Sequence, residues 1–300
     1  MTATAIAGQG ACLCAAALWA VSLVWFRPLI ERHGARAVNL AKCALACAML
    51  AVTVAVAGGF GGLAAAPAHD LALVALSGIV GLALGDTALF GAVKRLGTYR
   101  TLLLQNLAPA FAAAVAWGWL GRAPQPLAAL GAAVTLSGVV LVVAGRRERP
   151  DAPRPAALWG FALALGAAFS QGAGIVLAKE GMHTLGSLSA ALLRLAAGVG
   201  VLLVLAVPGG TALGGAARLF TEAGDRRRTM TATVLGTYLA FIAMMFGVRN
   251  APEAVAATLL ATTPVFSLAL GVATGEDRPT SRGLAGALLA VAGVAIMSAA

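Results

Sequence analysis

The chain has 300 residues, of which 60% are hydrophobic and 11% are charged, a balance too apolar for a soluble domain. The formal net charge of +10 would suit a nucleic-acid partner, but the basic residues lie between long apolar runs, where such residues fix membrane orientation. This composition excludes a soluble enzyme or nucleic-acid-binding domain and predicts a multi-pass membrane protein.

Ten apolar runs follow one another along the chain. Each has about 18 residues or more, enough to cross ~30 Å of hydrocarbon as a helix. The first run lacks the basic region and cleavage site of a signal peptide, so we expect it to remain as the first helix. The predicted spans are 8–26, 37–57, 71–93, 101–120, 126–145, 157–178, 186–207, 231–248, 254–273 and 282–299.

Basic residues are shared unequally between the two ends of these helices. Of the 21 Lys and Arg residues, 16 lie in the odd-numbered loops, three in the even-numbered loops and two inside helices. Because positively charged loops stay in the cytoplasm, this bias predicts that both termini lie outside a bacterial cytoplasmic (inner) membrane.

The two halves of the chain repeat one another. Lys42 has a counterpart in Arg194, 152 residues later, and Pro109 has a counterpart in Pro264, 155 residues later. Five helices in each half is an odd number, so the second half enters the membrane upside down relative to the first.

The sequence therefore predicts an all-α membrane protein with ten transmembrane helices in two five-helix inverted-topology repeats. The repeats are residues 1–145 and 157–300, joined by a basic loop at 146–156. This architecture is typical of secondary transporters, which bind their substrate between the halves.

Several stretches resemble a known family. GDTALFGAVKRLG, LAPAFAAAVAWGWLGR and TTPVFSLALGVATGEDRPTSRGLAGALLAVAGV are similar to the drug/metabolite transporter (DMT) superfamily, specifically its EamA-type members. The resemblance covers essentially the whole chain. It implies two homologous halves around a central cavity, and export of amino acids, other metabolites or drugs. Two features depart from the family: Gly275-Glu276 reads Gly121-Arg122 in the first half, and the family's termini are expected inside.

One carboxylate, Asp86, lies near the end of the third apolar run, and its counterpart in the second half is Phe241. This asymmetry favours a functional role. The carboxylate is tolerable there if it pairs with a cation such as Lys42, or if it stays protonated, which suits a proton-coupled carrier. A structural role, capping the backbone near Gly85, stays open.

Lys42 and Arg194 lie about two turns into the second and seventh helices. Basic side chains at such a depth either snorkel to the interface and position the helix, or face the protein interior as a gating or substrate-binding charge. Both interpretations stay open.

Pro109 and Pro264 are predicted deep in the fourth and ninth helices, where each should kink its helix and free the carbonyl four residues earlier. Paired breaks in matching helices point to a transport site, with simple packing kinks as the alternative. The polar residues that could satisfy these carbonyls or meet a substrate are Gln105, Asn106, Thr262 and Thr263.

Trp19 in the first helix has Gln171 as its counterpart in the sixth. An aromatic plane and an amide that face one cavity could hold a small organic molecule between them. Packing is an equally good explanation for a buried Trp.

The predicted function is a secondary transporter that exports small metabolites or drugs, such as amino acids, with proton coupling through Asp86. No Gly-x4-Gly-Lys-Ser/Thr phosphate loop is present, so a gradient must supply the energy. The expected partners are a small-molecule substrate, the lipid bilayer and, in the coupled case, protons. No nucleic acid, cofactor, metal or catalytic residue is expected, and the chain would act as a monomer or homodimer.

Two other classes stay open as alternatives. A membrane-embedded enzyme or a flippase of lipid-linked substrates would act on a lipid-borne ligand, although an enzyme of this kind generally needs carboxylate pairs, a Ser/His couple or a metal cluster. A non-transporting membrane subunit predicts a dry core.

Overall fold

The computed structural model describes residues 3–105, 107–123, 125–144, 154–207, 210–263, 265–266, 269–270 and 281–298, and this part of the chain is helical, without strands. The first half contains α1 (Ala3–His33), α2 (Ala35–Val56), α3 (Phe60–Ala65), α4 (Ala68–Gly78), the π-helix η1 (Ile79–Asp86), α5 (Thr87–Gln105), α6 (Ala108–Leu120) and α7 (Pro126–Ala144). The second half contains α8 (Arg154–Glu180), α9 (Ser187–Ala206), α10 (Thr211–Thr221), α11 (Ala223–Thr233), the π-helix η2 (Val234–Leu239), α12 (Ala240–Asn250), α13 (Glu253–Leu260) and α15 (Ser281–Ser298).

The helices have the length and the surface of a membrane protein. Six of the described helical stretches are long and apolar enough to cross a bilayer, and α6, α7 and α15 add shorter apolar segments. Large apolar side chains such as Val52, Val204 and Val291 are exposed on the outside, where lipid rather than water would surround them. The fold is therefore an all-α membrane fold.

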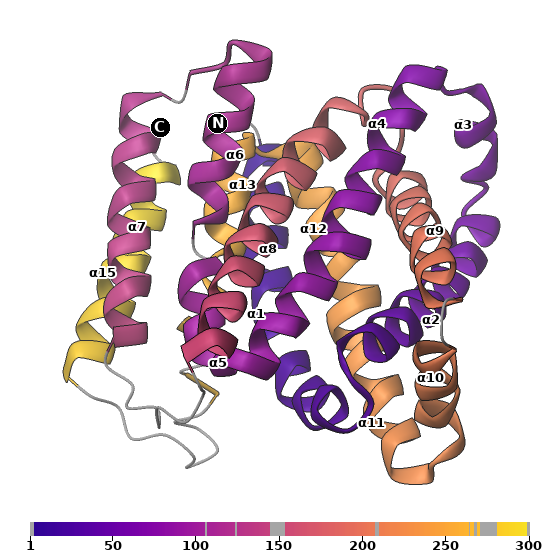
Figure 1. Ribbon diagram of the computed structural model, residues 1–300. Coiled ribbons are helices and arrows are strands. Elements are labelled where there is room, and N and C mark those ends of the chain that lie inside the picture. The colour runs from indigo at the N-terminus through magenta and orange to yellow at the C-terminus, as the bar shows by residue number, and fades with distance from the viewer. Residues whose placement is uncertain are drawn as a thin grey trace.

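The two halves contact each other in a two-fold pattern (Figure 1). Helix α2 packs against α9 and α7 packs against α15, so each of these helices meets its own counterpart. Helix α1 packs against α12 while α8 packs against α5, which exchanges the first and third spans of the two halves. A two-fold axis between the halves produces this reciprocity, and five spans in each half make the second half an inverted copy. Both termini lie at the same end of the bundle (Figure 1).

Glycines bring the α7–α15 pair into backbone contact. A Cβ on Gly138 would collide with the backbone of Ala290, and a Cβ on Gly293 would collide with the backbone of Thr135. Small residues allow this approach, and close packing of this kind holds membrane helices together without a hydrophobic driving force. The fifth span of each half is thus fixed against that of the other.

In the described part of each half, the third span contains a π-helix at the equivalent place. Helix η1 begins at Ile79 and η2 begins at Val234, 155 residues later. π-Turns widen a helix, rotate the residues that follow and are frequent at functional sites. Helix η1 ends on Asp86, so the widened turn sets the direction of this carboxylate.

The predicted position of Pro109 deep in a helix was wrong. Helix α6 begins at Ala108, so Pro109 lies in the first turn, where its missing N–H removes no helical hydrogen bond. The predicted span 101–120 is accordingly divided between the end of α5 and α6. In the second half α13 ends at Leu260, 155 residues after the end of α5 at Gln105. The break at Pro109 is thus a helix end rather than a kink, and α13 ends at the matching position of the second half.

Other predicted boundaries shift by a few residues or more. The third span does not end at residue 93, because its helix continues to Gln105. Helix α8 begins at Arg154, inside the predicted loop 146–156, because Pro155 is tolerated in a first turn. Asn106 and Pro264 lie outside the described residues.

Candidate functional site

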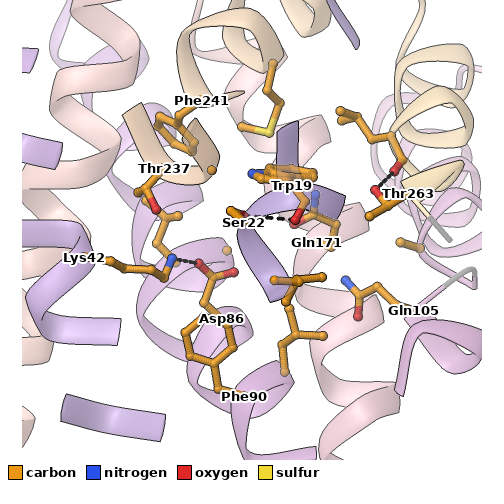
Figure 2. A pocket seen from close by; sticks show the side chains of 18 of the residues that line it. Trp19, Ser22, Lys42, Asp86, Phe90, Gln105, Gln171, Thr237, Phe241 and Thr263 are labelled. Atoms are coloured by element: carbon orange, nitrogen blue, oxygen red, sulfur yellow. Dashed lines mark hydrogen bonds and ion pairs between the residues drawn. The ribbon is translucent and has the colours of Figure 1, made fainter. Parts of the chain in front are cut away.

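A cavity of about 120 Å³ lies between the two halves. Such a volume holds several water molecules or a small organic group. Its wall is built from both halves, mostly of apolar and aromatic side chains with a few polar groups, as is usual for small-molecule sites. In the view of Figure 2, Lys42 and Asp86 lie on one side of the cavity, Gln105 and Thr263 on the other, and Trp19 between them.

The structure brings most of the predicted site residues to this cavity. Those that line it are Trp19, Lys42, Asp86, Gln105, Gln171, Arg194 and Thr263. Thr263 also donates a hydrogen bond to the Leu260 carbonyl at 2.8 Å, at the end of α13. Thr262 does not line the cavity, and its hydroxyl donates to the Leu259 carbonyl at 2.6 Å.

Lys42 and Asp86 form an ion pair in the cavity wall. Lys42 Nζ lies 2.6 Å from Asp86 Oδ2 and 5.4 Å from the centre of the Phe90 ring. The Lys42 side chain is 6% exposed and that of Asp86 is 21% exposed, so a ligand or a water molecule in the cavity reaches the carboxylate more easily. Of the two routes expected for Asp86, the structure shows pairing with Lys42.

The second half repeats the positions of this contact with different chemistry. Arg194 places its guanidinium 5.3 Å from the centre of the Phe241 ring, and its Nη1 lies 3.4 Å from Met245 Sδ. Phe241 and Met245 are the counterparts of Asp86 and Phe90, 155 residues later. In each half, the basic residue of the second span therefore faces two equivalent positions of the third span of that half. Only in the first half is one of these positions a carboxylate.

Both cations face the interior of the protein. Lys42 is 5% exposed and Arg194 is 3% exposed, so neither snorkels to the membrane interface. With Asp86, these two charges give the described cavity wall one more positive charge than negative.

Two polar atoms in the cavity wall have no hydrogen-bond partner among the described residues. They are Gln105 Oε1, an acceptor, and Arg194 Nε, a donor, and both atoms are buried. Buried polar atoms are nearly always paired, so such exceptions suggest positions where a ligand or water would bind.

Sequence reasoning missed several residues of this site. Ser22, Phe90 and Thr237 line the cavity, and Asn39 supports it from behind. Asn39 is completely buried and donates to the Leu82 carbonyl of η1 at 2.8 Å and to Thr87 Oγ1 at 2.9 Å. A polar amide three residues before Lys42 in an apolar helix was a signal that could have identified it.

We expect Asn39→Leu to lower the free energy of unfolding by roughly 1–3 kcal/mol, because the substitution leaves the buried Leu82 carbonyl without its donor. It should also weaken transport, since η1 carries Asp86. Thermal unfolding in detergent measures the first effect, and transport by the folded fraction measures the second. Unchanged values for both would show that Asn39 does not hold η1.

Polar contacts join the two halves at both ends of the bundle. At one end Asp225 accepts hydrogen bonds from Arg32 Nη1 at 3.1 Å and pairs with His33 Nε2 at 2.7 Å. At the other end Arg122 pairs with Glu180. We call these the two end contacts.

One end contact also has the composition of a cation site. The ligand atoms of His33, Glu222 and Asp225 lie within 4.8 Å of one another, a cluster that was not predicted. Asp225 already pairs with Arg32 and contacts His33 Nε2, so these contacts account for the arrangement.

A cavity lined by apolar side chains and a few charged and polar groups, between two inverted helical halves in a membrane, is the arrangement of a transporter of small molecules. The chain belongs to the EamA-like transporter family, which matches residues 6–144 and 158–299. The two matched regions correspond to the two halves that enclose the cavity.

Individual proteins are also similar to this chain. A protein of Streptantibioticus cattleyicolor described as a "Probable terminal-alkyne amino-acid exporter" is 35% identical over 95 residues, which cover 31% of this chain and 32% of that protein. The chain thus matches about a third of the length of this curated relative. A solved protein crystal structure has a TM-score of 0.75, covering 99% of this chain and 97% of that one at 17% identity, a similarity of fold alone.

Proposed function

We propose that this protein is a secondary transporter that exports amino acids or similar small metabolites across the bacterial cytoplasmic membrane, coupled to protons through Asp86. The charge bias of the loops supports an orientation with both termini outside. The name of the curated relative supports an amino-acid substrate.

The observation that carries the proposal is the Lys42–Asp86 ion pair in the wall of the central cavity. A charge inside a membrane protein is costly and usually marks an ion or substrate pathway. Asp86 is not required by the repeat, since its counterpart is Phe241. A carboxylate that is both partly exposed to the cavity and absent from the second half is suited to a task performed once per transport cycle.

The ion pair provides a switch between two states of the carrier. With Asp86 charged, Lys42 is held by the carboxylate and by the Phe90 ring. A proton on Asp86 removes the negative charge, so Lys42 loses its counter-ion. A protonated and an unprotonated carrier then favour different arrangements of the halves. Alternating access requires the two end contacts to open in turn.

Transport in reconstituted proteoliposomes tests the proposal. The substrates would be labelled neutral L-amino acids, including one with a terminal alkyne such as propargylglycine. We expect an imposed pH gradient to drive uptake into vesicles that contain the protein, and a protonophore to abolish the driven part. Vesicles with protein that move no member of this panel above the level of empty vesicles would contradict the amino-acid assignment.

A further inference from the structure

We propose that Arg194 binds the carboxylate group of the transported molecule, and this inference rests on the function proposed above. Arg194 is 3% exposed, lines the central cavity and has a buried Nε with no hydrogen-bond partner among the described residues. An arginine presents a planar fork of donors that matches a carboxylate, so this side chain can bind both carboxylate oxygens at once.

The partners of Arg194 are weak ones for a buried charge. Nη1 lies 3.4 Å from the thioether sulfur of Met245, and Nη2 lies 3.4 Å from the Ser77 carbonyl. The Phe241 ring lies on one face of the guanidinium at 5.3 Å. None of these groups carries a negative charge, so among the described residues the guanidinium has no carboxylate in direct contact, and the one acid of the cavity wall, Asp86, is bonded to Lys42.

Lys42 has a carboxylate partner that Arg194 does not have at the equivalent position. Lys42 faces a carboxylate at Asp86, whereas Arg194 faces Phe241 at the matching position. Because Asp86 already pairs with Lys42, the described cavity wall keeps one positive charge in excess, at Arg194. A ligand that brings its own carboxylate would supply the absent counter-ion, and the site would then be neutral.

Glycines make the room in which this guanidinium lies. A Cβ on Gly81 would lie 2.8 Å from Arg194 Nη2, too close to fit without a shift, whereas a Cβ on Gly174 would lie 3.5 Å from the same atom, at an ordinary contact distance. Gly78, the last residue of α4, allows α4 to approach the backbone of Arg194 itself, where any Cβ would collide. The guanidinium is therefore held at a definite place by elements of both halves, as recognition of a planar group requires.

Binding of three matched ligands to the purified transporter tests the inference. The ligands are L-norvaline, its amide, which lacks the carboxylate, and pentanoate, which lacks the amine. We expect the wild-type protein to bind norvaline more tightly than the amide. In Arg194→Gln the ratio of the two affinities should fall about tenfold or more, because only the acid loses its charged hydrogen bonds. Arg194→Lys should keep part of the preference.

A second variant keeps the test valid if Arg194→Gln fails to fold. Gly81→Ala keeps the arginine, but the new Cβ displaces its guanidinium. This variant should therefore also lower the ratio of norvaline to amide affinity. Gly200→Ala is the matched control on α9, since its Cβ would meet nothing within 4 Å, and it should leave the ratio unchanged.

Each outcome decides between the two proposals. An unchanged ratio in both test variants, or equal weakening of acid and amide, would overturn the role of Arg194 and leave amino-acid export standing. Wild-type protein that binds pentanoate but not norvaline would support Arg194 as the carboxylate site and count against amino acids as substrates. Failure of the wild type to bind either carboxylate would refute the inference.

Discussion

Replacing Asp86 by Asn is expected to abolish pH-gradient-driven transport while the protein still folds. Asn has the same size and keeps an acceptor oxygen for Lys42 Nζ, which lies 2.6 Å from Asp86 in the wild type. It cannot gain or lose a proton, so the charge change that the switch needs is absent. In proteoliposomes with an imposed pH gradient, we expect uptake to fall to the level of empty vesicles.

Controls separate coupling from folding in this experiment. Exchange of labelled for unlabelled substrate at equal pH needs no net proton movement, and Asp86→Asn should retain it. Asp70→Asn is a matched control, because Asp70 binds Thr184 at 2.8 Å outside the cavity, and it should keep driven transport. Proton-driven uptake at the wild-type rate in Asp86→Asn would rule out Asp86 as the coupling group.

Replacing Lys42 by Met is expected to cost about 3–5 kcal/mol of unfolding free energy, because it leaves a partly buried carboxylate without its partner. The double substitution Lys42→Met with Asp86→Leu should lie within about 1 kcal/mol of the wild type, since apolar side chains of similar volume can replace a buried ion pair. The double variant should nevertheless be inactive. Thermal and denaturant unfolding in detergent measure these differences.

An exposed ion pair provides the control for the stability changes expected at Lys42 and Asp86. Arg27 and Glu31 pair at 3.3 Å with side chains that are 62% and 60% exposed. Solvent screens such a pair, so Arg27→Met should change stability by roughly 0–1 kcal/mol. If Lys42→Met costs no more than Arg27→Met, the cavity pair is not held by the electrostatics that we infer.

The membrane fold and the repeat could be read from the sequence because both depend on local properties. Apolar runs of sufficient length have few alternatives to a spanning helix. The shifts of 152 and 155 residues that relate Lys42 to Arg194 and Pro109 to Pro264 need only a comparison of the chain with itself. The contacts α2–α9 and α7–α15 in the structure show the same relation between the halves.

Helix ends near proline were harder to predict. A proline deep in a helix and a proline in a first turn look the same in sequence. A backbone hydrogen bond is lost only if the four residues before the proline are helical, and the apolar pattern does not show this. Because α5 ends at Gln105 and α6 begins at Ala108, Pro109 lies in the first turn of a helix. The π-helices η1 and η2 also escaped prediction, since a wider turn has no characteristic composition.

The sequence by itself determined that this chain is a two-part helical membrane protein, and that Asp86, Lys42 and Arg194 are its unusual intramembrane charges. Only the tertiary structure decided which of them meet. Asp86 is 44 residues from Lys42, and Phe241 is 47 residues from Arg194. The rotation of the third spans, set by the π-turns and by glycine contacts between helices, determines which side chains face each cation, and this rotation depends on packing over the whole bundle.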